Sequence, residues 1–148
     1  MKKEDIQNQF VNALKKEVIK LTPQRQAIFS DIMDSNDHRE CDDIYKSLSD
    51  SGVNVSRATI YRTLDILEKY NLVRKLLISA PMGDGKAKYE RKIGRKHHDH
   101  MICIETGDII EFENQRIEEL QEEEAKKHGY EIIKHVHQLF VKPIKKSV

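Results

Sequence analysis

The spacing of apolar residues changes period near residue 71, and this change limits the architectures open to the chain. Before it, apolar residues recur every three or four positions, which predicts helices over residues 6–20, 22–33, 41–49 and 56–70. After it, residues 72–79 and 86–91 have the pattern of two strands joined by a turn over 81–85. Three helices followed by a two-stranded hairpin are the order of a winged helix-turn-helix, here with an extra helix in front.

Capping residues support these helix boundaries. Thr22 is an N-cap residue followed by Pro23 at the first helical position, and Ser56 is the N-cap of the helix that runs to about Tyr70. The Asp-Ser-Gly cluster at 50–52 ends the third helix. The inward faces predicted for the first three helices are Ile6, Phe10, Val11, Leu14, Val18 and Ile19, then Ile28, Phe29, Ile32 and Met33, then Cys41, Ile44 and Leu48.

The second half of the chain has a different pattern. Residues 98–104 and 108–112 are strand-like around a turn at 105–107, and residues 114–128 are helical with Ile117 and Leu120 facing inward. Gly129 is placed to end that helix, and residues 130–142 alternate as one long strand. A β-α-β unit of about 50 residues is too small to bury a good core alone, so we expect self-association.

Together these patterns predict an α+β chain made of two domains. A winged-helix part comes first, a basic segment over residues 86–96 follows, and the β-α-β part comes last. Residues 86–96 hold six Lys or Arg against one Glu, whereas 105–125 hold nine Asp or Glu against one Arg. The net charge of +1 therefore conceals two oppositely charged segments.

The composition narrows the class of protein further. Of the 148 residues, 34% are charged and 38% hydrophobic, which suits a soluble globular chain and excludes a disordered tail or a membrane span. The first ten residues contain no apolar stretch of the signal-peptide kind, and two cysteines do not make a disulfide framework. We therefore expect a cytoplasmic protein in which Cys41 and Cys103 are buried thiols.

The helix over 56–70 has a face suited to a DNA major groove. An Arg such as Arg62 bonds guanine with two N–H groups, and Tyr61 is able to contact phosphate or a thymine methyl. Arg57 and Thr59, near the helix start, are placed to bind phosphates. An ordinary solvated helix face is the competing interpretation, and the helix and hairpin order with the basic run over 86–96 favours DNA. On a helical wheel the narrow inward seam is Ile60, Leu64, Leu67 and Asn71, and the opposite face is Ala58, Tyr61, Arg62, Asp65 and Lys69.

The run His97-His98-Asp99-His100 is the strongest sign of a metal site. Side chains of a strand alternate between faces, so His98 and His100 point one way while His97 and Asp99 point the other. Nitrogen and oxygen donors of this kind suit Fe(II), Mn(II), Co(II) or Zn(II). A single histidine is usually a surface or core residue, and we assign His128 and His137 to that ordinary class. Residues able to complete either ligand set are Glu111, Glu118 and His135.

With these residues assembled, the chain resembles the ferric uptake regulator (Fur) family of metal-dependent bacterial repressors. The resemblance spans nearly the whole length. It implies a winged-helix DNA-binding domain over residues 1–85, a basic hinge over 86–96 and an α/β dimerisation domain over 97–148. It also implies a homodimer that binds a palindromic DNA operator. The motifs that carry it are LTPQRQAIF (21–29), SRATIYRTLDIL (56–67), GDGKAKYE (83–90), HHDHMIC (97–103) and TGDIIEF (106–112).

The resemblance implies two sets of metal ligands. The first, the family's regulatory site, corresponds to His38, Glu90, His98, His100 and Glu111. The second corresponds to His97, Asp99, Glu118 and His135. Both agree with the strand alternation above, which could not have identified His38 or Glu90. The segment between Glu90 and His98 is one residue longer than a common family spacing.

Two departures from the family pattern bear on function. Most members hold a structural zinc with two CxxC pairs, whereas here the first pair would be Cys103 with Thr106, and residues 104–148 contain no cysteine. We therefore predict no structural zinc held by four cysteines. The peroxide-sensing branch typically has Asp at the position of Glu111, so Glu111 favours an Fe(II)-sensing regulator, with a peroxide-sensing or zinc-sensing member as the alternative.

The first ligand set implies a switch. One ion bound by all of its members would fix the DNA-binding half relative to the dimerisation half and lock the dimer for operator binding. A small non-haem metal enzyme is the alternative from another class, but no dedicated nucleophile or substrate-pocket signature is present. A metal buffer or chaperone would have no need of the 56–70 helix. We therefore expect a regulator and not an enzyme.

Overall fold

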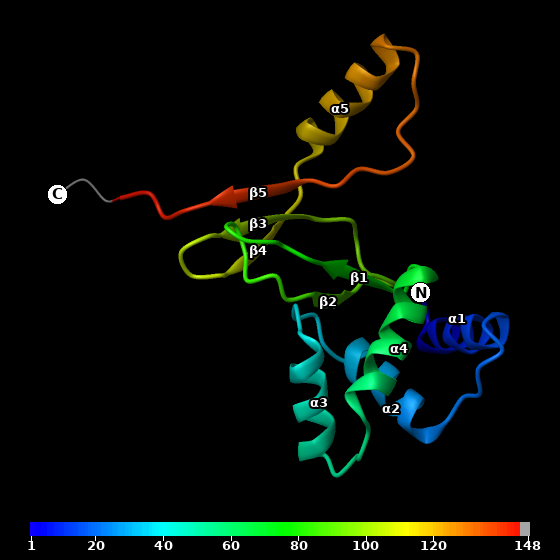
Figure 1. The fold of residues 1–148 in the computed structure, drawn as a ribbon. Coiled ribbons are helices and arrows are strands. Elements are labelled where there is room, and N and C mark those ends of the chain that lie inside the picture. The colour runs from blue at the N-terminus through cyan, green and yellow to red at the C-terminus, as the bar shows by residue number, and fades with distance from the viewer. Residues whose placement is uncertain (146–148) are drawn as a thin grey trace. The chain divides into compact units, whose positions relative to one another are not determined.

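A computed structural model of the chain describes residues 1–145, which fall into two compact units (Figure 1). Met1–Lys96 is called the N-terminal unit and His97–Val148 the C-terminal unit. Residues 146–148, the end of the domain predicted over 97–148, lie outside the described residues. The division falls after residue 96, where the predicted basic hinge ends.

The N-terminal unit has the order of a winged helix-turn-helix, as the sequence predicts. Its helices α1 (Lys3–Lys16), α2 (Pro23–Met33), α3 (Cys41–Asp50) and α4 (Arg57–Lys69) precede the strands β1 (Val73–Leu76) and β2 (Lys88–Arg91). The strands pair antiparallel, with Val73 opposite Arg91 and Leu76 opposite Lys88. β2 lies inside the segment predicted as a hinge, but because its backbone pairs with β1 it belongs to the wing of this unit.

Aromatic stacking joins the first two helices at the centre of the core. The rings of Phe10 and Phe29 lie with centroids 4.2 Å apart and planes 10° from parallel. Thr22 caps α2, as predicted, by accepting a hydrogen bond from the amide of Arg25 at 3.2 Å. Most of the predicted inward residues are confirmed as buried: Ile6, Phe10, Leu14, Ile28, Phe29, Ile32, Cys41, Ile44 and Leu48.

The α4 helix buries a wider face than its apolar seam indicates. Thr63 is completely buried although it is polar, because its hydroxyl donates to the carbonyl of Thr59 at 2.8 Å. Ile66 is buried as well, on the same side of the seam as Thr63. This broad inward face anchors α4, so that the outward face at its N-terminal end is presented from a rigid element.

The C-terminal unit is built on a three-stranded sheet of order β4-β3-β5. The strands are β3 (Asp99–Cys103), β4 (Ile109–Phe112) and β5 (Gln138–Val141), and helix α5 (Gln115–Lys127) lies between β4 and β5 in the chain. β3 pairs antiparallel with β4 and parallel with β5, which confirms the predicted β-α-β unit. Figure 1 shows α5 extending away from this sheet.

Two predictions for the C-terminal unit are wrong. The long strand expected over 130–142 is confined to β5, because only this part of the segment lies beside β3, and Ile133 is 95% exposed. Leu120, expected to face inward, is 55% exposed, and α5 buries none of its residues against the described chain. The apolar residues that suggested a strand and an inward helix face are thus exposed in this unit.

Four helices end in one backbone motif, in which the residue after the cap has a positive φ. The next amide then donates to the carbonyl five positions back, at 2.8 or 2.9 Å. Gly52, Asn71 and Gly129 hold this position in α3, α4 and α5, which confirms the predicted ends of α3 and α5. In α1 it is Val18, with φ of 57°, so that helix ends earlier than predicted and Val18 is exposed.

No helix among residues 1–145 combines the length and the apolar character that a membrane crossing requires.

Replacing Val18 should stabilise the N-terminal unit. A β-branched residue with positive φ carries a steric cost of about 1–2 kcal/mol, which Asn largely avoids. Val18 is 92% exposed, so little apolar burial is lost on replacement. We expect Val18→Asn to raise the free energy of unfolding by about 1 kcal/mol in urea titrations. A decrease would contradict the assigned backbone conformation, and Lys20→Asn is the matched surface control.

Candidate metal centres and nucleic-acid interface

Part of the first ligand set is assembled within the C-terminal unit by strand register. His100 of β3 lies directly opposite Glu111 of β4. The Nε2 atom of His98, just before β3, is 3.4 Å from a carboxylate oxygen of Glu111, and the His98 and His100 rings meet edge to face at 4.9 Å. His100 is 2% exposed. The alternation predicted from the sequence therefore gathers two imidazoles and one carboxylate.

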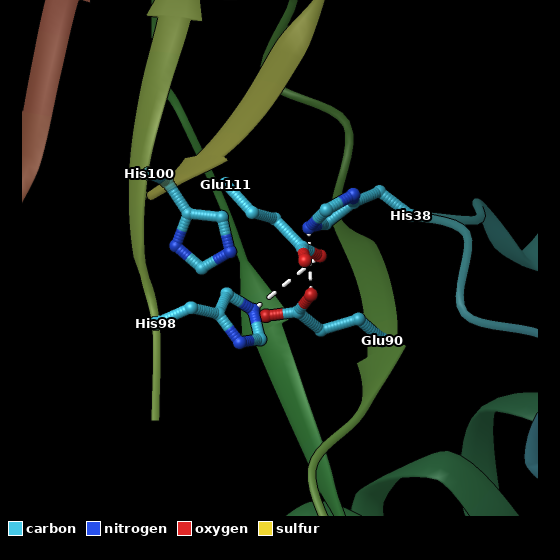
Figure 2. A group of neighbouring side chains, drawn as sticks. All are labelled: His38, Glu90, His98, His100 and Glu111. Atoms are coloured by element: carbon cyan, nitrogen blue, oxygen red, sulfur yellow. Dashed lines mark ion pairs between the residues drawn. The ribbon is translucent and has the colours of Figure 1, made fainter. Parts of the chain in front are cut away.

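The remaining members of the first set meet within the N-terminal unit. Backbone hydrogen bonds in both directions join Arg39 and Tyr89, at 2.9 and 2.7 Å, and set the segment before α3 alongside β2. The neighbouring residues are thereby paired, with His38 Nε2 at 2.7 Å from Glu90 Oε2 (Figure 2). Glu90 is 1% exposed and is also approached by two guanidinium groups, those of Arg74 at 3.9 Å and Arg95 at 3.6 Å.

The second ligand set lies wholly within the C-terminal unit. Its four members each offer one ligand atom, and these atoms all lie within 4.8 Å of one another. The Nε2 atoms of His97 and His135 are 2.9 Å apart, and both are 3.2 Å from Asp99 Oδ1. Glu118 Oε1 lies 3.3 Å from His97 Nε2. The sequence placed these residues on one face by alternation and resemblance, and the fold brings them to one point.

This geometry fits a divalent cation. For bonds of about 2.1 Å, neighbouring ligand atoms lie about 3.0 Å apart around an octahedral ion and about 3.4 Å apart around a tetrahedral one. Two carboxylates with two neutral imidazoles also balance a charge of +2. Glu118 Oε1 is buried without a hydrogen-bond partner among the described residues, which is a costly state for an anion that a bound cation would relieve.

The two cysteines occupy different units, and neither is exposed. Cys41 is buried in the N-terminal core, where burial raises the pKa of its thiol and Tyr61 hydrogen-bonds to it. Cys103 ends β3, and a hydrogen bond from the Thr106 side chain lowers the pKa of its thiol. Thr106 also accepts from the amide of Asp108 at 3.2 Å, so it closes the turn between β3 and β4.

The predicted DNA-contacting residues gather at the N-terminal end of α4. Ser56 is confirmed as the N-cap, since its hydroxyl accepts from the amide of Thr59 at 3.2 Å. Arg57 is exposed and is held by Asp42 of α3 at 2.8 Å, with its guanidinium 4.1 Å from the ring centre of Tyr45. The other two predicted contacts, Tyr61 and Arg62, are also exposed.

Sequence comparison finds relatives that belong to one family of regulators. A profile of the Ferric uptake regulator family matches residues 16–140. The ferric uptake regulation protein of Rhizobium leguminosarum is 33% identical over 129 residues, which cover 87% of each chain. That of Campylobacter jejuni is 37% identical over 133 residues, covering 88% of this chain and 82% of the relative.

Solved structures show the same likeness. The Helicobacter pylori ferric uptake regulator, described with three functional metal-binding sites, has a TM-score of 0.84 and 32% identity, covering 97% of this chain and 92% of its own. The Pseudomonas aeruginosa regulator with manganese has a TM-score of 0.76 and 32% identity, covering 89% and 96%. A zinc-bound manganese uptake regulator has a TM-score of 0.63 and 30% identity, covering 91% and 98%.

The winged helix-turn-helix and the imidazole–carboxylate clusters together define a metal-responsive transcription regulator. The chain belongs to the Ferric uptake regulator family. Members of this family are regulators of transcription and not enzymes.

The buried side chain of Tyr89, the residue whose backbone pairs with Arg39, should affect the stability of the protein at alkaline pH. Burial raises the pKa of Tyr89 from its ordinary value of 10 to about 12, so folding favours the protonated phenol. The stabilisation is complete below pH 10, where the unfolded phenol is also protonated, and is lost as the pH rises towards 12.

Between pH 10 and 12 the free energy of unfolding should therefore fall less in Tyr89→Phe than in the parent. The difference between the two losses should be about 1–3 kcal/mol. Denaturant titrations of both proteins across this range measure the difference. Parallel losses in the two proteins would contradict a buried phenol.

Proposed function

We propose that the protein is an Fe(II)-sensing repressor in which one ion draws ligands from both units. The observation that carries this proposal is that the residues of the first ligand set are distributed between the two units. The N-terminal unit pairs His38 with Glu90, and the C-terminal unit gathers His98, His100 and Glu111. Neither group alone gives a divalent transition ion a full shell of protein donors, so an ion that binds all of them requires both units.

Such an ion would act by selecting an orientation. Without metal, the two units would sample many relative orientations, and binding would favour those in which both groups of donors reach the ion. If that orientation also fits the operator, metal tightens DNA binding. DNA must then tighten metal binding by the same factor, typically between 5-fold and 150-fold.

The second ligand set binds a further divalent ion in this proposal. The ion would join β3, through His97 and Asp99, to Glu118 at the start of α5 and to His135 ahead of β5. Because α5 buries no residue against the described chain, this ligation would supply an attachment that packing does not. The ion would thus order the C-terminal unit, whereas the first ion sets the orientation between units.

We further propose that the protein is a homodimer formed through the C-terminal unit. In the described part of that unit, only Ile102 and Cys103 are buried hydrophobic residues, which is a small core for a separate domain. Large apolar side chains are exposed there instead, and pairing of two copies would cover them. These side chains are Ile104, Ile110, Leu120, Tyr130, Ile132, Ile133, Val136, Leu139, Phe140 and Ile144.

A homodimer carries two α4 helices, which matches a palindromic operator with two half-sites. In each copy, Arg57 and Thr59 would bind phosphates, while Tyr61 and Arg62 would reach base edges. Asp42 and the Tyr45 ring hold Arg57 at the start of the helix, which reduces the entropy lost when it meets a phosphate.

Fe(II) is the proposed signal because the donors are imidazoles and carboxylates and because Glu111 stands where the peroxide-sensing branch typically has Asp. The same donors accept Mn(II) and Zn(II), and a related solved structure is a zinc-bound manganese uptake regulator. Metal analysis of protein purified without oxygen decides between them. At least one equivalent of iron per chain is expected, since the second set holds a further ion, and protein that contains manganese or zinc but no iron would reassign the signal.

We propose that the protein has no structural zinc held by four cysteines. The chain contains two cysteines, which cannot supply four thiolates, and they lie in different units. Thr106 closes the turn after β3 by hydrogen bonds to Cys103 and to the amide of Asp108. Native mass spectrometry showing zinc that resists chelation and depends on Cys103 would overturn this proposal.

His98→Ala should uncouple DNA binding from metal. The substitution removes an imidazole from the first set, so the affinity for the protein's own upstream DNA should become equal with and without Mn(II) or Fe(II). In the parent, metal should raise the affinity for this DNA at least about 5-fold. Fluorescence anisotropy without oxygen measures both affinities, and analytical ultracentrifugation should show an unchanged dimer.

The matched control is His128→Ala, which changes an exposed histidine outside both sets and should leave the response intact. A parent that binds DNA equally with and without metal would refute the switch.

Arg62→Ala should weaken operator binding by about 1–3 kcal/mol if the guanidinium bonds a guanine. The loss should appear for operator DNA and be small for unrelated DNA, because a base contact carries sequence information whereas a phosphate contact does not. Competition anisotropy with both DNAs measures it. Lys126→Ala, an exposed cation on α5, is the control, and an equal loss for both DNAs would reassign Arg62 to phosphate binding.

A further inference from the structure

A histidine outside both ligand sets lies against the second one. The Nδ1 atom of His137 is 3.7 Å from Asp99 Oδ2, whereas the two ligand histidines approach the other carboxylate oxygen, Oδ1. His137 Nδ1 and Asp99 Oδ2 are buried, and neither has a hydrogen-bond partner among the described residues. The Asp99 side chain itself is 2% exposed. Two buried polar atoms that face each other without a hydrogen bond form an incomplete interaction.

The fold fixes the position of this histidine. The carbonyl of His137 accepts a hydrogen bond from the amide of His100 at 3.3 Å, which ties its backbone to β3. Its ring meets the Phe112 ring edge to face, with centroids 5.5 Å apart and planes at 82°. Phe112 in turn lies directly opposite Asp99 in the β3–β4 register. The imidazole and the carboxylate are therefore held by the same three strands, which limits how far they can separate.

The two carboxylate oxygens of Asp99 have different surroundings. Oδ1 lies 3.2 Å from both His97 and His135, among the ligand atoms of the second set, whereas Oδ2 faces His137. A carboxylate that binds a metal through one oxygen is commonly oriented by a hydrogen bond to the other. Since a carboxylate only accepts, the partner must donate, and the Nδ1–H tautomer of a neutral imidazole does so.

We propose that His137 is a positioning residue for the second metal site, donating from Nδ1 to Asp99 Oδ2 when Oδ1 binds a divalent ion. This inference rests on metal binding by the second ligand set, as proposed above. The present separation exceeds a hydrogen bond by less than 1 Å, so a small rotation of the ring or of the carboxylate completes it. The hydrogen bond fixes the direction of Oδ1 and balances the buried charge on Oδ2.

The test isolates the second site in the full-length chain. His98→Ala with Glu111→Ala removes two ligands of the first set and serves as the parent, in which Co(II) is titrated by visible absorption and by calorimetry. In that parent, His137→Leu should raise the dissociation constant about 10-fold to 100-fold, the range seen for outer partners of metal ligands. His137→Asn should restore most of the affinity, because its side-chain nitrogen also sits on Cγ and donates.

Two further measurements separate positioning from a merely structural effect. His128→Leu, which changes an exposed histidine at the end of α5, should bind Co(II) as the parent does. With Zn(II) bound, the long-range proton–nitrogen spectrum of the parent should show His137 protonated at Nδ1. Thermal denaturation without metal checks that the His137 variants are folded. If the Leu variant is not folded, the proton–nitrogen spectrum carries the test, and a His137 without a proton on Nδ1 would overturn the inference.

Equal Co(II) affinity in the Leu variant and the parent would overturn the inference, and so would an Asn variant as weak as the Leu variant. A parent that binds no Co(II) overturns metal binding by the second set itself, and with it the role of His137. A parent that binds Co(II) normally while the substitutions have no effect overturns only the role of His137. The two failures are therefore distinguishable.

Discussion

The alternation of side chains along one strand is the constraint on which the metal chemistry of this protein depends. Because successive residues of β3 and of the segment before it face opposite ways, four consecutive residues supply donors to two separate sets. Register then adds Glu111 to one face, and the crossover through α5 adds Glu118 and His135 to the other. A slip of one residue would exchange the two faces and dismantle both sets.

The two sets suit different tasks because their members are distributed differently between the units. The second set lies within one unit and joins elements that bury little apolar surface, so metal there is proposed to order the C-terminal unit. The members of the first set are divided between units, so metal there is proposed to contribute orientation. In both, buried carboxylates that would be costly alone become favourable when a cation is bound, which links folding energy to metal concentration.

The sequence predicted most of this fold, because its helix caps, apolar spacing and strand alternation are local signals. It failed where apolar residues are not covered by the unit itself: the strand expected over 130–142 is confined to β5, and Leu120 is exposed. Within the sites, alternation separated His97 from His98 correctly, but His38 came only through the resemblance, because the Arg39–Tyr89 bridge that pairs it with Glu90 is a long-range contact. His137 was assigned no role, since its nearness to Asp99 depends on how β5 aligns with β3.

The relative orientation of the two units with and without metal tests the central proposal most directly. Residual dipolar couplings of backbone amides give an alignment tensor for each unit separately, and diamagnetic Zn(II) permits the measurement. We expect different tensors for the two units in protein prepared without metal, and one common tensor when Zn(II) fills the first ligand set. Tensors that remain different at saturating Zn(II), or that already coincide without metal, would contradict an ion that fixes the orientation of the units.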